Sequence, residues 1–359
     1  MDTSDLRGFI DEVARPGSLR VEDDFGSGFV RLRVSEAQRR QAKQDIRCVE
    51  DAAVEMLRNA RDAHAKTIFF AVSRSGDTRT LVVIDDGDGV PVDMHELIFE
   101  PRVTSKLDSF SEDAWGVHGR GMALYSIKEN AEEAAVVASA PGRGSVFRVS
   151  FLTASVRERK DQSTLPTLDK NADGAWELGS GPRNIVRVTA DFALDARRFC
   201  TVYFGSPVQI AATLRAYGES RICARHVPDA ALEDEMFACR LSSCRDAAEF
   251  ASCAESLGLS VSQRSAYRIL QNDIAPLAPL LAVLRHESVS RPLENVASPS
   301  YIDARGLKIA PEDRAEFTAA LKRAWALLAS AYYLEPDIDP QVRVSRDGVR
   351  VVFPAYKQL

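Results

Sequence analysis

Residues 55–63 read Glu-Met-Leu-Arg-Asn-Ala-Arg-Asp-Ala, and residues 85–89 read Asp-Asp-Gly-Asp-Gly. The first stretch lies near the end of an amphipathic pattern that predicts a helix over residues 36–65, with Ser35 as its N-cap. Glu55, Asn59 and Asp62 are spaced so that they share one face of this helix. A carboxylate and an amide on one face are suited to hold hydrated Mg²⁺, which prefers oxygen ligands and keeps several waters.

The second stretch follows a strand predicted over residues 80–84. Gly87 and Gly89 allow the backbone to approach a flat ligand closely. A buried carboxylate at Asp85 is suited to accept a hydrogen bond from an exocyclic amine such as that of adenine.

Two further stretches carry polar and glycine-rich motifs. Residues 99–106 read Phe-Glu-Pro-Arg-Val-Thr-Ser-Lys, and residues 116–124 read Gly-Val-His-Gly-Arg-Gly-Met-Ala-Leu. The second of these opens a helix predicted over residues 121–130, where backbone amides attract phosphate. Lys106 and Arg120 can add charge-assisted contacts.

The four stretches, in this order, resemble the motifs of the GHKL (Bergerat-fold) ATPases. Residues 55–63 are similar to the N box, residues 85–89 to the first glycine box and residues 119–124 to the second. The stretch over residues 99–106 resembles both the F-box region of histidine kinases and the corresponding part of the mismatch-repair MutL class. The resemblance covers residues 28–152. Asp86 stands where the family usually has Asn, and His118 and Arg120 flank Gly119.

The resemblance implies an α+β fold, a two-layer sandwich of a mixed sheet covered by helices, with ATP and Mg²⁺ held between the layers. It implies that Glu55 acts on the attacking water, that Asn59 holds Mg²⁺ with Glu55 reaching it through water, and that Lys106 acts catalytically at the γ-phosphate. It places a mobile lid over residues 105–119. The expected ATP-binding residues are Asn59, Asp62, Ala63, Asp85, Gly87, Gly89, Thr104, Ser105, Lys106, Gly116, His118, Gly119, Arg120, Gly121, Met122 and Ala123.

The predicted elements divide the chain into four parts. Residues 1–27 form an N-terminal extension, residues 28–153 the ATP-binding domain, residues 154–184 a polar linker, and residues 185–359 a mixed α/β C-terminal domain. Within the first domain, strands are predicted over residues 28–34, 67–72, 80–84, 134–140 and 145–152. In the C-terminal part, strands are predicted over residues 184–190 and 342–353, and helices over residues 246–257, 266–284 and 312–332.

Composition and charge limit the classes of function. The 359 residues contain no apolar run long enough to cross a bilayer and no signal-peptide pattern at the N-terminus, so we expect a cytoplasmic protein with no membrane partner. The net charge of −6 argues against a general nucleic-acid binder, although a local basic patch stays open. The six cysteines do not form a secreted disulfide pattern.

Several interpretations stay open at this point. The leading one is an ATPase whose cycle drives a conformational change or the binding of an unknown protein partner, with a homodimer as its assembly. The alternatives are a histidine-kinase-type enzyme acting on a histidine in trans, and a nucleotide-gated binding module without turnover. Cys223, His226, Cys239 and Cys244 form an irregularly spaced candidate zinc set, for which ordinary cysteines are the competing interpretation.

Overall fold

The computed structural model describes residues 21–26, 28–104, 111–113, 116–118, 121–171, 174–225, 235–290, 301–303, 311–332, 334–345 and 348–353. Contacts within the chain divide it into two compact units, Met1–Ser288 and Val289–Leu359. Each unit is described by itself. Within the described residues, no helix combines the length and apolar character needed to cross a membrane.

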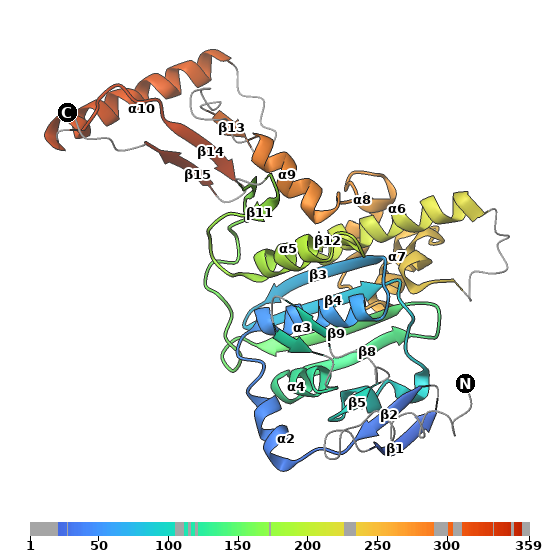
Figure 1. Cartoon of the computed structure of the whole chain (residues 1–359). Helices are drawn as coiled ribbons and strands as arrows, with labels where there is room; N and C mark the ends of the chain where they lie inside the picture. The colour runs from blue at the N-terminus through green and yellow to red at the C-terminus, as the bar shows by residue number, and fades with distance from the viewer. Residues whose placement is uncertain are drawn as a thin grey trace. The chain divides into compact units, whose positions relative to one another are not determined.

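A five-stranded mixed sheet is the centre of the first unit (Figure 1). In sheet order, the strands are β12 (Thr201–Gly205), β3 (Thr67–Ser75), β4 (Thr78–Asp85), β9 (Ser145–Leu152) and β8 (Glu133–Ser139). All neighbouring strands are antiparallel except the first pair, β12 and β3, which is parallel. The hairpin of β3 and β4 turns at Gly76.

One face of the sheet packs against α3 (Val49–Asp62), α4 (Ala123–Asn130) and α5 (Ile185–Asp195). Alternate residues of the strands, among them Phe70 and Leu81, contact the buried stripe of α3. This arrangement follows from the two periodicities of the sequence, since strands present every second side chain to one face and helices every third or fourth. The expected α+β class, with a mixed sheet covered by helices, is confirmed.

The opposite face is covered as well, by α6 (Pro207–Arg225), the short helix η4 (Phe237–Ser242), α7 (Ala247–Ser256) and α8 (Gln263–Leu270). The other set of alternating strand residues, including Phe69 and Val82, packs against these helices. The first unit therefore adds a second helical layer to the expected two-layer sandwich.

A smaller sheet is formed by β1 (Val21–Gly26), β2 (Phe29–Leu32) and β5 (Val103–Thr104), in that order. β2 lies within the strand predicted over residues 28–34, whereas β1 lies in the part expected to be an extension. The helix α2 (Glu36–Lys43) follows, and two short helices, η1 (Val92–Met94) and η2 (Leu97–Phe99), precede β5. Strand pairs are also formed by β6 (Ser111–Asp113) with β7 (Gly116–His118) and by β10 (Leu168–Lys170) with β11 (Trp176–Leu178).

The single helix predicted over residues 36–65 is two helices, α2 and α3. The break falls at residues 44–48, where the Asp51 carboxylate accepts hydrogen bonds from the backbone N–H groups of Arg47 and Cys48, at 3.0 and 3.2 Å. A carboxylate in the first turn satisfies N–H groups that have no partner within the helix. The local sequence therefore starts a new helix at Val49.

The strand predicted over residues 184–190 is wrong, because these residues begin α5. The Asn184 side chain caps the helix by accepting a 3.0 Å hydrogen bond from the Arg187 N–H. The buried residues Ile185, Val188 and Phe192 recur at helical spacing. The strand that joins the sheet is β12, which lies later in the chain than the expected linker over residues 154–184. The central sheet therefore contains strands from both sides of that linker.

The contacts within the chain separate its two compact units after Ser288.

The helix predicted over residues 266–284 is also divided, into α8 and α9 (Leu280–Ser290), with Pro276 and Pro279 between them. In the second unit, β13 (Tyr301–Asp303) pairs parallel with β14 (Gln341–Ser345), which forms a hairpin with β15 (Gly348–Val352). α10 (Pro311–Tyr332) carries Trp325, whose ring stacks on Phe353 with centroids 4.7 Å apart. The helix predicted over residues 312–332 and the strands predicted within 342–353 are confirmed.

Candidate functional site

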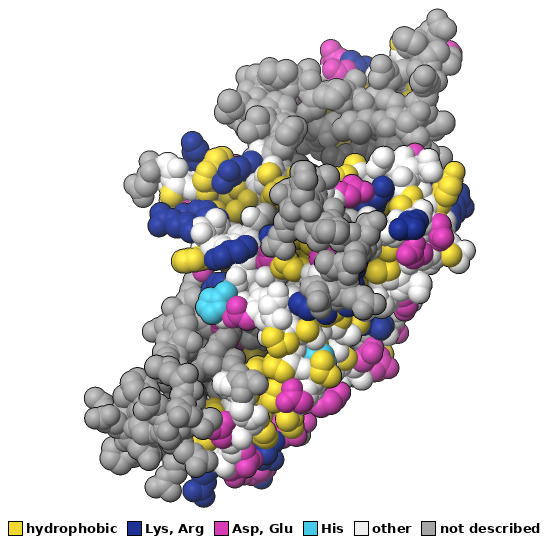
Figure 2. Space-filling view, turned by 90° about the vertical axis from the view of Figure 1, so that its right-hand side faces the viewer, with side chains coloured by type: hydrophobic (Ala, Val, Ile, Leu, Met, Phe, Trp, Pro, Cys, Tyr) yellow, Lys and Arg dark blue, Asp and Glu magenta, His cyan; other side chains and the backbone are white. Residues whose placement is uncertain are grey.

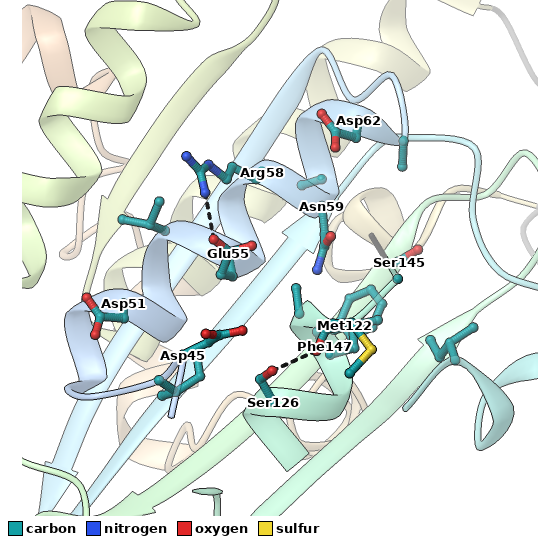
Figure 3. Close-up of a pocket in the computed structure, with 18 of the residues that line it drawn as sticks. Asp45, Asp51, Glu55, Arg58, Asn59, Asp62, Met122, Ser126, Ser145 and Phe147 are labelled. Atoms are coloured by element: carbon teal, nitrogen blue, oxygen red, sulfur yellow. Dashed lines mark hydrogen bonds and ion pairs between the residues drawn. The ribbon is translucent and has the colours of Figure 1, made fainter. Parts of the chain in front are cut away.

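A cavity of about 1660 Å³ lies between α3, the N-terminal end of α4 and the ends of β4 and β9 (Figure 3). Ten of the predicted site residues line it, the proposed base Glu55 and nine predicted ATP-binding residues, and they come from all four motifs. They are Glu55, Asn59, Asp62, Ala63, Asp85, Gly89, Thr104, Gly121, Met122 and Ala123. The fold therefore brings together stretches that lie far apart in the sequence.

On α3, Glu55 and Asn59 lie one turn apart and both line the cavity. In Figure 3 the Asn59 amide points toward Met122, the residue that precedes α4. Its Nδ2 atom is buried and makes no hydrogen bond to any residue that the structure describes. A buried amide without a partner is unfavourable unless a ligand or water supplies one. Asn59 is therefore suited to contact a polar ligand.

The Glu55 carboxylate lines the same cavity, and its Oε1 accepts a 2.6 Å hydrogen bond from Nη1 of Arg58. The Arg58 side chain is only 6% exposed and that of Glu55 24%. The carboxylate is thus held by an ion pair at the wall of the cavity.

Asp85 is the last residue of β4, and its side chain is buried. Its Oδ1 accepts a 2.8 Å hydrogen bond from the Gly87 N–H, and the Ser145 backbone also bonds to the carboxylate. Burial raises the pKa of Asp85 from 3.8 to about 7, the Gly87 hydrogen bond opposes this rise, and the charge of Asp86 adds to it. The group is an acceptor at the base of the cavity whose ionisation is poised near neutral pH.

Asp86 is turned away from the cavity. Its Oδ1 accepts hydrogen bonds from the backbone N–H groups of Lys66 and Thr67, both at 2.7 Å. Its Oδ2 accepts a 2.8 Å hydrogen bond from the Tyr217 hydroxyl and lies 3.5 Å from Nη2 of Arg221. Asp86 therefore joins the start of β3 and helix α6 to the end of β4. The carboxylate that distinguishes this chain from the usual Asn is thus hydrogen-bonded on the side of the motif away from the cavity, while its charge still contributes to the raised pKa of Asp85.

The two predicted glycines have different roles. Gly89 lines the cavity, and with φ +77° a Cβ there would lie 1.9 Å from the Ala140 carbonyl oxygen. Gly87 does not line the cavity. It lies against α3, where a Cβ would meet the Ala63 carbonyl oxygen at 2.4 Å, and that oxygen accepts a 2.8 Å hydrogen bond from the Asp88 N–H. The motif therefore needs Gly87 to pack the turn onto the end of α3.

The cavity wall at the start of α4 is formed by Thr104, Gly121, Met122 and Ala123. Gly121 adopts φ +65°, and its carbonyl oxygen accepts a 2.7 Å hydrogen bond from the Arg102 N–H. The first N–H groups of α4 have no partner within the helix, so this wall is suited to an anionic group.

The remaining predicted residues lie in the stretch expected to be a lid, residues 105–119, or directly after it. Ser105, Lys106, Gly119 and Arg120 lie outside the described residues. The structure describes Gly116 and His118 only as backbone in β7, paired with Asp113 and Ser111 of β6.

Several lining residues were not predicted from the sequence, among them Arg58, Ser145 and Phe147. Arg58 lies inside the N-box stretch and could have been found from its helical position, three residues after Glu55. The segment over residues 157–159 gave no such signal, because it reaches the cavity only through tertiary contacts. There the Arg157 carbonyl oxygen accepts a 3.0 Å hydrogen bond from the Val49 N–H.

The candidate zinc set is not assembled in the part of the chain that the structure describes. Cys239 and Cys244 are buried free cysteines, and no three His, Cys, Asp or Glu side chains among the described residues form a metal-binding group. The Cys223 side chain and His226 lie outside the described residues.

The Lys and Arg side chains on the face drawn in Figure 2 lie scattered among acidic and hydrophobic ones.

Comparisons with known proteins agree with this site. The family described as histidine kinase-, DNA gyrase B- and HSP90-like ATPase matches residues 44–155. The DNA mismatch repair protein MutL of Thermus thermophilus is 40% identical over 86 residues, which is 23% of this chain and 15% of that relative. MutL of Thermus aquaticus gives 40% over 83 residues, again 23% and 15%, and MutL of Clostridium beijerinckii 40% over 76 residues, 20% and 11%.

The chain thus matches only 15% of the length of the Thermus relatives. The family match covers residues 44–155, and all four motifs lie within these residues. The segment over residues 44–155 is therefore an ATPase domain of the GHKL superfamily.

Proposed function

We propose that this protein binds Mg²⁺-ATP in the cavity and hydrolyses it. The observation that carries the proposal is that two polar groups line the same cavity. Asp85 is a buried acceptor at the end of β4, and Asn59 on α3 has a buried Nδ2 atom that makes no hydrogen bond to the described residues. Such a pair suits a ligand that has an amine at one end and an oxygen-rich, metal-binding group at the other.

Asp85 is the group that would read the base. Its carboxylate accepts hydrogen bonds and has no donor when ionised, which favours the exocyclic amine of adenine over the carbonyl of guanine. A site built around a buried acceptor rejects a ligand that cannot donate to it, because the acceptor is then left unpaired.

The phosphates and the metal would lie between α3 and the start of α4. The residues fit Mg²⁺, because the Asn59 amide supplies an oxygen ligand and the ion needs few protein contacts. When bound, the ion would supply charge neutralisation at the β- and γ-phosphates. Gly121, Met122 and Ala123 would hold the phosphates through backbone N–H groups, and Lys106 would stabilise charge at the γ-phosphate.

Glu55 is the group proposed to orient and deprotonate the attacking water. It lies one helical turn before Asn59, so a water next to a metal held by Asn59 would be within reach of its carboxylate. A base acts mainly in the transition state, so its loss lowers turnover more than binding.

The experiment compares Glu55→Gln with Asn59→Ala by nucleotide titration and phosphate release. Glu55→Gln should leave ATP affinity within a few-fold and lower hydrolysis by roughly 10²-fold or more. Asn59→Ala should weaken Mg²⁺-dependent ATP binding itself. Glu36→Gln on α2, outside the cavity, is the matched control for the loss of a helical carboxylate. Abolished binding in Glu55→Gln, or no change in either quantity, would contradict the role of Glu55.

Incubation with γ-labelled ATP separates hydrolysis from the two alternatives. Free phosphate supports an ATPase, an acid-labile label on protein supports a kinase that transfers to histidine, and neither supports a binding module. We further propose that nucleotide turnover drives a conformational change or partner binding, with a homodimer as the assembly. The likeness to MutL covers only 15% of that relative. It therefore supports the nucleotide-binding part of the proposal and does not bear on the partner or the assembly.

A further inference from the structure

Arg58 is a buried arginine beside the proposed base, and none of the motifs assigns it a role. It lies on α3, three residues after Glu55 and one before Asn59. Its Nη1 donates a 2.6 Å hydrogen bond to Oε1 of Glu55, and its side chain is almost completely shielded from solvent. A guanidinium buried to this degree is costly unless a carboxylate compensates it. The pair is therefore a coupled unit rather than a surface salt bridge.

The consequence for Glu55 is a restricted carboxylate. A glutamate side chain at the wall of a large cavity can adopt several rotamers, and fixing one costs entropy. A short charge-assisted hydrogen bond to a buried guanidinium selects one rotamer before any ligand arrives. Such pre-organisation matters for a base, because a displacement of about 1 Å can cost roughly 10²-fold in rate.

Arg58 also lines the cavity, but its guanidinium contacts the proposed base and not the Asn59 amide. In Figure 3 its guanidinium approaches the Glu55 carboxylate from the side away from Asn59, while the Asn59 amide points toward Met122. Arg58 thus contacts the proposed base, and its guanidinium is directed away from the wall formed by the start of α4.

We propose that Arg58 is a positioning residue that holds the Glu55 carboxylate in the orientation needed to act on water. This inference rests on the proposed function, and it names the residue that prepares the site for turnover. It predicts that Arg58 affects the chemical step through Glu55 and leaves nucleotide binding nearly unchanged.

The test uses the full chain with Arg58→Met, Arg58→Lys, Glu55→Gln and the double variant Glu55→Gln/Arg58→Met. ATP binding is measured by titration and turnover by phosphate release. Arg58→Met keeps the aliphatic bulk and should lower kcat by about tenfold or more, with KM and ATP affinity within about threefold. Arg58→Lys should restore most of kcat. In the Glu55→Gln background, Arg58→Met should cause no further loss, since residues that act as one unit are non-additive.

Arg215→Met is the matched control, because Arg215 also pairs with a glutamate on its own helix, at 2.9 Å from Glu219, and lies on α6 outside the cavity. It should leave kcat unchanged, and thermal unfolding of every variant reports on the fold. If Arg58→Met does not fold, the kcat of Arg58→Lys becomes the deciding measurement. A loss in kcat of more than about tenfold in Arg58→Lys would then contradict the proposal.

Three outcomes overturn the inference. An unchanged kcat in Arg58→Met, alongside wild-type hydrolysis that Glu55→Gln abolishes, refutes the role of Arg58 and leaves the proposed function intact. A loss of ATP affinity that exceeds the loss of ADP affinity makes Arg58 a γ-phosphate ligand instead. A wild-type protein that binds ATP and releases no phosphate refutes the proposed hydrolysis, and the inference fails with it.

Discussion

Replacing Asp85 by asparagine should remove a pH dependence of stability that the structure assigns to this one side chain. Burial raises the pKa of Asp85 from 3.8 to about 7, so the folded protein holds this proton more tightly than the unfolded chain does. The free energy of unfolding of the wild type should therefore fall, through this group, as pH rises from about 4 to about 7. This rise in pKa corresponds to a loss of roughly 4 kcal/mol in the free energy of unfolding once Asp85 is fully ionised.

The asparagine side chain of the Asp85→Asn variant is neutral throughout this range, and its amide oxygen can still accept the hydrogen bond from the Gly87 N–H. The free energy of unfolding of Asp85→Asn minus that of the wild type should thus increase from about pH 4.5 to about pH 8, by up to roughly 4 kcal/mol. Urea denaturation followed by circular dichroism at several pH values measures this difference directly.

Asp161→Asn is a control of opposite sign. Hydrogen bonds from Thr164, followed by those from Ser163, lower the pKa of the exposed Asp161 to about 2, so its contribution is lost only as pH falls toward 2. Its difference from wild type should be flat between about pH 4.5 and about pH 8. A flat difference for Asp85→Asn, or one that decreases with rising pH, would show that the buried environment assigned to Asp85 is incorrect.

Two further predictions concern residues that shape the site. Gly89→Ala should destabilise the fold by more than about 2 kcal/mol, because its Cβ would lie 1.9 Å from a backbone carbonyl oxygen. Gly76→Ala has open space around it and should cost only about 1–2 kcal/mol, because of its positive φ. Thermal unfolding of the two variants measures the difference. Tyr217→Phe should cost about 2 kcal/mol, because it removes the donor to the buried Asp86 carboxylate, and should leave ATP affinity within a few-fold. Tyr267→Phe, at a side chain 58% exposed, should be within about 0.5 kcal/mol of wild type, and equal losses in the two tyrosine variants would refute the role given to Asp86.

The elements that surround the cavity could be predicted from the sequence because their patterns are local. The apolar spacing of α3, the alternation of β3 and β4 and the turn at Gly76 each depend on neighbours within a few residues. The glycine turn at residues 85–89 could also be placed, since its order relative to the N-box helix is specific. These features determine which polar side chains share one cavity.

Features that depend on tertiary contacts could not be predicted. Residues 184–190 have the apolar content of a strand, and only the cap at Asn184 and the packing of α5 make them helical. The second helical layer could not be predicted. The apolar residues of β3 and β4 indicate that both faces of the sheet are buried, but they do not indicate which helices cover the second face. The turn of Asp86 away from the cavity depends on Tyr217 and Arg221, which lie 131 and 135 residues later in the chain.

The most direct test of the central claim is a calorimetric titration of the wild-type chain with ATP and with GTP in the presence of Mg²⁺. We predict saturable binding of ATP, binding of GTP weaker by roughly tenfold or more, and a loss of roughly 5- to 150-fold in ATP affinity in Asp85→Asn. Equal affinity for the two nucleotides, unchanged ATP affinity in Asp85→Asn, or no binding of ATP at all would contradict the assignment of this cavity as an adenine-nucleotide site.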